Sequence, residues 1–152
     1  MPDPLPFDSV SPRWNLPYLF SGQAQKEVFV NEAHALVDAL LHGTIEAQSD
    51  TPPPDPDEGT VWLVGGAPTG AWAGRAGQLA CREQGIWLFV APRDGLRLLD
   101  RESGQERLYR GGWLAPAAPP LPVGGATIDT EARGAIASLI ASLREVGIFA
   151  EA

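Results

Sequence analysis

Residues 78–100 read QLACREQGIWLFVAPRDGLRLLD, and this stretch decides the fold class. Short apolar or alternating runs are separated by the turn residues Gln84-Gly85 and Asp94-Gly95, a spacing typical of successive antiparallel strands. The run Ile86–Val90 is apolar on both of its alternating faces, so we expect it to be the most central strand. The stretch therefore predicts a small antiparallel meander or barrel.

The strand pattern extends to both sides of this stretch. Residues 44–48 and 60–64 precede it with β-type runs, and a loop with four prolines, residues 51–59, lies between these two runs. Two further runs, residues 106–109 and 113–114, follow it and are bounded by glycines. The β section thus spans residues 44–114.

A helix is predicted before the β section, over residues 21–41. Ser21 or Gly22 can cap its start, and Gly43 suits a left-handed stop. Apolar residues recur along it at helical spacing, and we expect this stripe to pack against the β section. The stripe consists of Phe29, Ala33, Leu36, Val37 and Leu40.

The opposite face of this helix carries a polar stripe. Its members are spaced four, four, three and four residues apart, namely Gln23, Glu27, Asn31, His34 and Asp38. Facing water is one reading of such a stripe. Fixing the register between identical subunits is the other, because amides and paired charges give specificity without making an isolated subunit sticky. We hypothesise a subunit interface at Gln23, Glu27 and Asn31.

A second helix is predicted near the C-terminus, after a linker at residues 115–126 that holds four prolines and two glycines. Asp129 can cap this helix, and Gly147 fits a Schellman stop. Its apolar residues follow the four-three spacing of a heptad seam, namely Ala132, Ile136, Leu139, Leu143 and Val146. The seam either packs on the β section of its own chain or joins subunits. For the second case we predict an interface at Ile136, Leu139 and Leu143.

Together these elements predict an α+β fold, with the N-terminal helix packed on the β meander or barrel. We expect an extended, proline-rich arm over residues 1–20 and a helix plus β domain over residues 21–114. The Pro/Gly linker over residues 115–126 and a C-terminal oligomerisation or docking helix over residues 127–152 complete the chain.

Charge and composition argue against several classes of partner. The formal net charge is −8, and the arginines are interleaved with acidic residues rather than gathered on one face, so nucleic acid is not an expected partner. No stretch approaches the ~20 apolar residues of a spanning helix, and no leader pattern is present, so we expect no membrane insertion and a protein kept in the bacterial cytoplasm until assembly.

No catalytic or metal-binding pattern stands out. The single cysteine, Cys81, excludes an internal disulfide and reads as a small buried residue. His34, Asp38 and His42 lie four residues apart and could geometrically share a metal, but surface polarity explains them better. The nucleophile elbow, phosphate loop and metalloprotease motifs are missing. We therefore expect a non-enzymatic protein without metal or cofactor.

The tryptophans of the β section offer one candidate contact residue. Trp62 and Trp87 lie inside apolar runs and are predicted to fill the core. Trp72 lies among small residues in the predicted loop 69–74, so it is the best candidate for an exposed aromatic that stacks on a sugar ring. It supports an alternative function as a carbohydrate-binding module that recognises host surface polysaccharide.

The motifs GQAQKE at residues 22–27, NEA at 31–33 and LVDAL at 36–40 resemble a domain family of unknown biochemical function. This family occurs in alphaproteobacterial phage tail or fibre proteins and in gene transfer agent particles. The proline loop into Glu58-Gly59 and the GIW motif at residues 85–87 are also similar to it.

The resemblance implies a virion structural protein located in a phage-like particle. The expected role is the base of a head spike or fibre, or a module for host attachment. We expect a homo-oligomer, a trimer or pentamer, that docks onto other particle proteins of the capsid or fibre.

Overall fold

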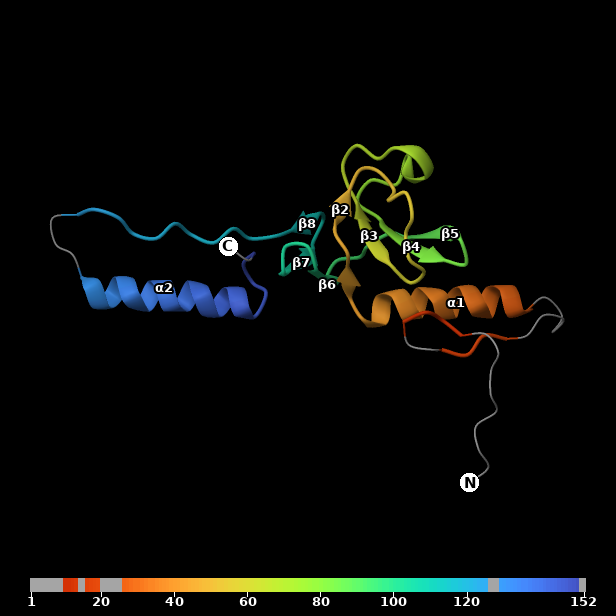
Figure 1. Ribbon diagram of the computed structural model, residues 1–152, viewed down its shortest axis with the longest axis horizontal. Coiled ribbons are helices and arrows are strands. Elements are labelled where there is room, and N and C mark those ends of the chain that lie inside the picture. Colours follow the sequence, from red (N-terminus) through yellow and green to blue (C-terminus); the bar gives the residue numbers. More distant parts are fainter. Residues whose placement is uncertain (1–9, 14–15, 20–25, 126–128, 151–152) are drawn as a thin grey trace, which may run out of the picture. The chain divides into compact units, whose positions relative to one another are not determined.

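The computed structural model describes residues 10–13, 16–19, 26–125 and 129–150. The chain divides into two compact units, residues 1–92 and residues 93–152. Helices and small sheets of mixed and antiparallel strands make up these units (Figure 1), which confirms the predicted α+β class.

The first unit consists of a helix and a four-stranded sheet. The helix α1 (Lys26–Leu41) precedes the short strands β1 (Thr44–Ile45) and β2 (Gln48–Ser49). The strands β3 (Val61–Val64), β4 (Leu79–Glu83) and β5 (Ile86–Val90) follow, with a 3₁₀ turn, η1 (Gly70–Trp72), between β3 and β4. The strand order is β2-β3-β4-β5, with β2 parallel to β3 and the remaining pairs antiparallel.

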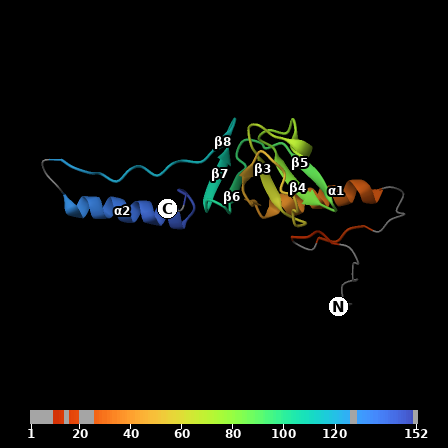
Figure 2. The ribbon, with the colours of Figure 1, turned by 45° about the horizontal axis from the view of Figure 1, so that its top comes forward.

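The predicted position of Ile86–Val90 was wrong, because β5 is the edge strand of this sheet and pairs with β4 alone among the described strands. Its apolar residues serve two different faces. Trp87 and Phe89 pack against a buried cluster on one face, whereas Ile86 and Leu88 lie on the face where α1 packs against β4 (Figure 2). An edge strand can therefore be apolar on both faces without being central.

The second unit holds an antiparallel meander and a helix. Its strands are β6 (Arg97–Asp100), β7 (Gln105–Tyr109) and β8 (Trp113–Leu114), followed by residues 115–125 without helix or strand and by α2 (Thr130–Glu145). The pairs β6–β7 and β7–β8 are antiparallel. In the described ranges the strands form open sheets, so the meander prediction holds and the barrel alternative does not.

The predicted helix ends are confirmed wherever the structure describes them. The Asp129 side chain accepts a hydrogen bond from the Ala132 N–H, at 2.8 Å. At the other end of α2, Gly147 has a φ of +75°, and the Ile148 N–H donates to the Leu143 carbonyl as in a Schellman stop. Ser21 and Gly22, the predicted start of the first helix, lie outside the described residues.

Candidate interaction surfaces

The apolar stripe of α1 is only partly covered, unlike the prediction. Phe29 is 76% exposed, and Ala33 and Val37 are exposed as well, whereas Leu36 and Leu40 are partly buried. The buried residues of this helix are Ala35, Asp38 and Ala39, which lie outside the predicted stripe. The expectation that the whole stripe packs on the sheet was therefore wrong, and small and polar residues take the most buried positions.

The polar stripe is turned inward because it binds the N-terminal arm. Asn31 accepts a hydrogen bond from the Leu19 N–H at 2.8 Å and donates one to the Leu19 carbonyl at 3.2 Å. The His34 Nδ1 lies 3.0 Å from the Pro17 carbonyl oxygen. These bonds satisfy arm backbone groups that an apolar helix face would leave unpaired. The stripe thus serves a contact within the chain.

The other two residues of the predicted polar interface are Glu27 and Gln23, and the structure describes only Glu27. Glu27 is partly buried and lines an open groove beside β5. Gln23 lies outside the described residues. A subunit contact at Gln23, Glu27 and Asn31 stays a prediction, with the amide of Asn31 already occupied by Leu19.

Arg13 fixes the C-terminal end of α1 against the following segment. Its Nε donates to the Gly59 carbonyl at 2.6 Å, and its two terminal nitrogens lie 3.3 Å from the carbonyl oxygens of Ala39 and Thr44. A cation at this position also complements the negative end of the helix dipole. The described arm residues are therefore an integral part of the first unit.

The seam of α2 is open to solvent in the chain. Leu139 is 60% exposed and Val146 is 66% exposed, with Ile136 also exposed and Leu143 intermediate. Ile140, on the neighbouring face, is the buried residue of this helix. The predicted interface residues Ile136 and Leu139 therefore lie outside the buried part of α2.

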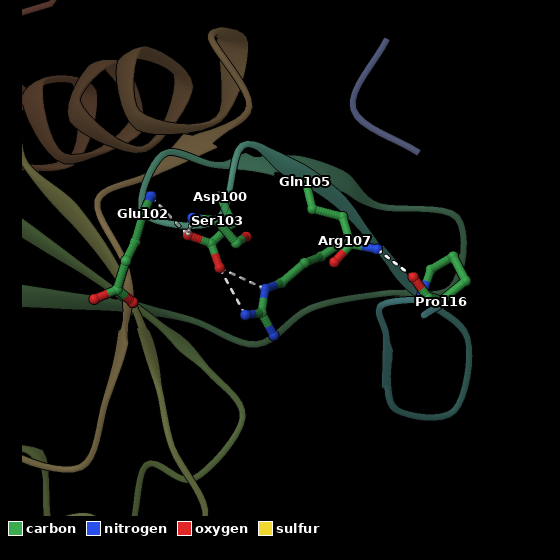
Figure 3. Close-up of polar contacts among 6 residues, drawn as sticks. All are labelled: Asp100, Glu102, Ser103, Gln105, Arg107 and Pro116. Atoms are coloured by element: carbon green, nitrogen blue, oxygen red, sulfur yellow. Dashed lines mark hydrogen bonds and ion pairs between the residues drawn. The ribbon is translucent and has the colours of Figure 1, made fainter. Parts of the chain in front are cut away.

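One glutamine holds both ends of the segment that carries α2. The Gln105 Nε2 donates to the Pro116 carbonyl at 2.6 Å, where the linker begins, and to the Ile148 carbonyl at 2.9 Å, just after the helix. Figure 3 shows this side chain reaching Pro116 from β7. No local pattern indicates this role, because the two acceptors lie 11 and 43 residues away in sequence.

A buried ion pair stabilises the turn that leads to Gln105. Asp100 is almost fully buried, and its Oδ2 accepts hydrogen bonds from Nε and Nη2 of Arg107 at 2.9 and 2.6 Å (Figure 3). Its Oδ1 accepts from the backbone N–H groups of Glu102 and Ser103. Because every oxygen of the carboxylate is used, the Asp100 cluster is structural.

Trp72 does not have the exposure that the sugar-stacking hypothesis requires. Its side chain is fully buried, at 0% exposure, and packs with Val64 and Ala80. Its ring meets that of Trp87 edge to face at 5.1 Å, and the Trp62 ring is 6.4 Å away. The loop was predicted correctly, but small neighbours in sequence do not reveal that the ring turns inward.

The titratable side chains of Cys81 and Glu83 have raised pKa values. Burial raises the pKa of Cys81 to about 12, which keeps the thiol protonated and inert. Burial also raises the pKa of Glu83, which accepts a hydrogen bond from the Tyr18 hydroxyl at 2.8 Å.

The described part of the chain holds no cluster of three or more His, Cys, Asp or Glu residues suited to a metal. None of its helices is long and apolar enough to span a membrane.

A protein-family model, described as a protein of unknown function (DUF2793), matches residues 30–114, more than half of the chain. The chain belongs to the DUF2793 family. No curated protein matches it. The DUF2793 region extends from within α1 through β8, so it includes most of the residues that line the groove beside β5, with Tyr18, Glu27 and Val28 preceding it. The linker and α2 follow the DUF2793 region, which places the exposed seam outside the part that defines the family.

Proposed function

We propose that this DUF2793 protein is a structural component of a phage-like particle, and that its subunits associate through the seam of α2. The role we infer is a spike or fibre base, or an adhesion module, within a gene transfer agent or prophage particle. The sequence motifs at residues 22–40 supply the particle context, and membership of a family of unknown function is compatible with it.

The observation that carries the association is the exposure of a heptad seam on α2, within a segment whose two ends, Pro116 and Ile148, are held by Gln105. A solvent-exposed row of Ile136, Leu139 and Val146 leaves apolar area in water that packing against identical helices would bury. The buried position of the helix is Ile140, which lies outside the seam, so the seam residues Ile136 and Leu139 remain exposed. Ile136 and Leu143 fall at one core position of the heptad and Leu139 and Val146 at the other, a mixed pattern that is compatible with the proposed trimer or pentamer.

The two alternatives have less support. The burial of Trp72 removes the exposed ring on which a carbohydrate-binding function rested. An interface on the polar stripe of α1 would compete with the bonds from Asn31 to the N-terminal arm. The α2 seam is therefore the surface that we assign to subunit association.

The test is the mass of the purified chain in solution, measured by light scattering at micromolar concentration. We expect wild type to be a closed oligomer and Leu139→Asp to be a folded monomer with the helical content of wild type, as measured by circular dichroism. Ala141→Asp is the matched control, because Ala141 is exposed on the opposite face of α2 and its substitution should leave the oligomer intact. A monomeric wild type would contradict the proposed association.

The particle context needs a separate measurement. Purified phage-like particles should contain the chain at a fixed stoichiometry, and Leu139→Asp should reduce its incorporation. Finding the chain only outside particles would contradict the structural role while leaving the oligomer result untouched.

A further inference from the structure

An open groove of about 300 Å³ lies between α1 and the hairpin of β4 and β5. We call it the β5 groove. Val28 of α1 and Ile86 of β5 form apolar walls and are 61% and 58% exposed, with Leu88 between them partly buried. Two large apolar side chains that remain this exposed within one concave surface mark a contact site.

The edge of the sheet beside the groove has backbone groups available for pairing. The Arg82 N–H donates to the Thr60 carbonyl, and the Arg82 carbonyl accepts from the Gly59 N–H, so both groups of this β4 residue point away from β5. In an antiparallel ladder these directions alternate, and the residue directly opposite Arg82 is Trp87. The N–H and C=O groups of Trp87 and Phe89 are therefore directed outward, at an edge that no described strand covers.

The charge of the groove specifies its occupant further. Glu27, Glu32 and Glu83 are among its ten lining residues, and none of the ten is a lysine or an arginine. A cation entering the groove would gain from these three carboxylates, and it would also offset the burial that raises the pKa of Glu83.

We propose that the β5 groove binds an extended segment of a different protein as an added β-strand. The backbone of this segment pairs with Trp87 and Phe89, and every second side chain points into the groove. Apolar side chains there contact Val28 and Ile86, and a lysine or arginine pairs with Glu32 or Glu83. The proposal is independent of the α2 seam, because all its residues belong to the first unit.

A different protein is favoured over a second copy because of the chain's own extended segment. Residues 115–125 contain four prolines and no charged residue. Proline lacks the N–H that pairing requires, and an uncharged segment gains nothing from the glutamates. The occupant that fits both the edge and the charge is therefore a foreign strand with alternating apolar and basic residues.

The first test uses a random nine-residue peptide library displayed on phage and selected on the full chain. We expect selected peptides to alternate apolar residues with lysine or arginine. Glu32→Lys should weaken their binding about tenfold, since it replaces an attraction by a repulsion, and Ile86→Asp should weaken it at least as much. Glu131→Lys, at an exposed glutamate of α2, is the control for net charge and should leave binding unchanged. Selected peptides without basic residues, or equal losses for both lysine variants, would overturn the proposal.

The second test identifies the binding mode and the source of the occupant. Hydrogen exchange should slow at the amides of Trp87 and Phe89 when a selected peptide is bound, and unchanged exchange there would rule out strand addition. Leu139→Asp should bind the peptide as wild type does, even if the α2 seam proves not to assemble subunits. If Ile86→Asp instead dissociates a wild-type oligomer, the groove binds a second copy and the proposed foreign strand is wrong.

Discussion

The Asp38 side chain accepts a hydrogen bond from the backbone N–H of Arg13 at 2.8 Å, across 25 residues of sequence. Asp38 is 2% exposed and lies in the last turn of α1, near the buried Ala35 and Ala39. The bond to Arg13 explains why a carboxylate of the polar stripe is buried.

Replacing Asp38 by alanine should destabilise the fold by about 1–3 kcal/mol, because a buried N–H is left without its acceptor. Glu32→Ala is the matched control, since Glu32 is an exposed carboxylate of the same helix and should change stability by about 0.5 kcal/mol or less. Urea unfolding followed by circular dichroism measures both. Equal effects would mean that the arm is not held by Asp38.

The hydrophobic pattern of α1 would predict a large loss of stability on replacing Phe29 and a small one on replacing Ala39. The structure predicts the reverse. Phe29→Ser should change the free energy of unfolding of the isolated subunit by about 0.5 kcal/mol or less. Ala39→Leu should lower it by about 1–3 kcal/mol, because the larger side chain has no space on the buried face. Thermal unfolding at low protein concentration distinguishes the two. A large loss with Phe29→Ser would restore the conventional orientation.

Trp72→Ala should lower the free energy of unfolding by about 3–5 kcal/mol, the usual cost of removing a large side chain from a core. Trp72→Phe should cost less, because a ring still faces Trp87. Chemical denaturation of the two variants measures this order. Unchanged stability of Trp72→Ala would show that the ring is on the surface, and would revive the sugar-binding hypothesis.

Cys81 should react slowly with thiol reagents in the folded protein at about pH 8 and at the ordinary rate in urea, because its pKa is raised from 9.0 to about 12.

The raised pKa of Cys81 should also make stability depend on pH, because the folded state holds the thiol proton more tightly than the unfolded state. The stabilisation from the neutral thiol is therefore complete below pH 9.0 and is lost as the pH rises toward about 12. Cys81→Ala should show a smaller loss of stability across this interval, as measured by urea unfolding. The same dependence of the free energy of unfolding on pH in wild type and Cys81→Ala would contradict the raised pKa.

Gln105→Ala should release the two ends of the segment that carries α2. We expect faster cleavage between residues 115 and 125 in limited proteolysis and a loss of about 1–3 kcal/mol, since two partly buried hydrogen bonds to carbonyls disappear. Arg93→Ala, at an exposed residue that precedes β6 in the same unit, is the control and should leave the cleavage rate unchanged. The same rate for all three proteins would show that Gln105 does not hold the linker.

The strands and helix ends could be predicted from sequence because their signals are local. Glycines at turns, alternation within short runs and the cap at Asp129 act over a few residues, and the structure has these elements at almost the predicted positions. The packing of each element was less predictable. Which face of α1 is buried depends on Arg13 and Leu19, and neither residue belongs to the helical pattern.

The candidate surfaces show the same division between local and distant causes. The α2 seam could be predicted because its spacing repeats within one helix. The β5 groove could not, because it arises from an edge position and from glutamates in α1 and β4 that are distant in sequence. Trp72 was predicted to be exposed because its neighbours in sequence are small. Its side chain is buried because it packs against Val64 and Trp87, which are more distant in sequence.

Because Gln105 bonds both Pro116 and Ile148, the segment between these two residues can change in length while its ends stay in place. Both ends of the segment are fixed at one side chain, so residues can be inserted or removed between them without disturbing the strand to which they attach. Doubling the length of such a loop costs only about 0.6 kcal/mol in closure entropy. Variation in linker length is thus a thermodynamically cheap way to change how far the second helix reaches, and with it the span of the assembly that we propose.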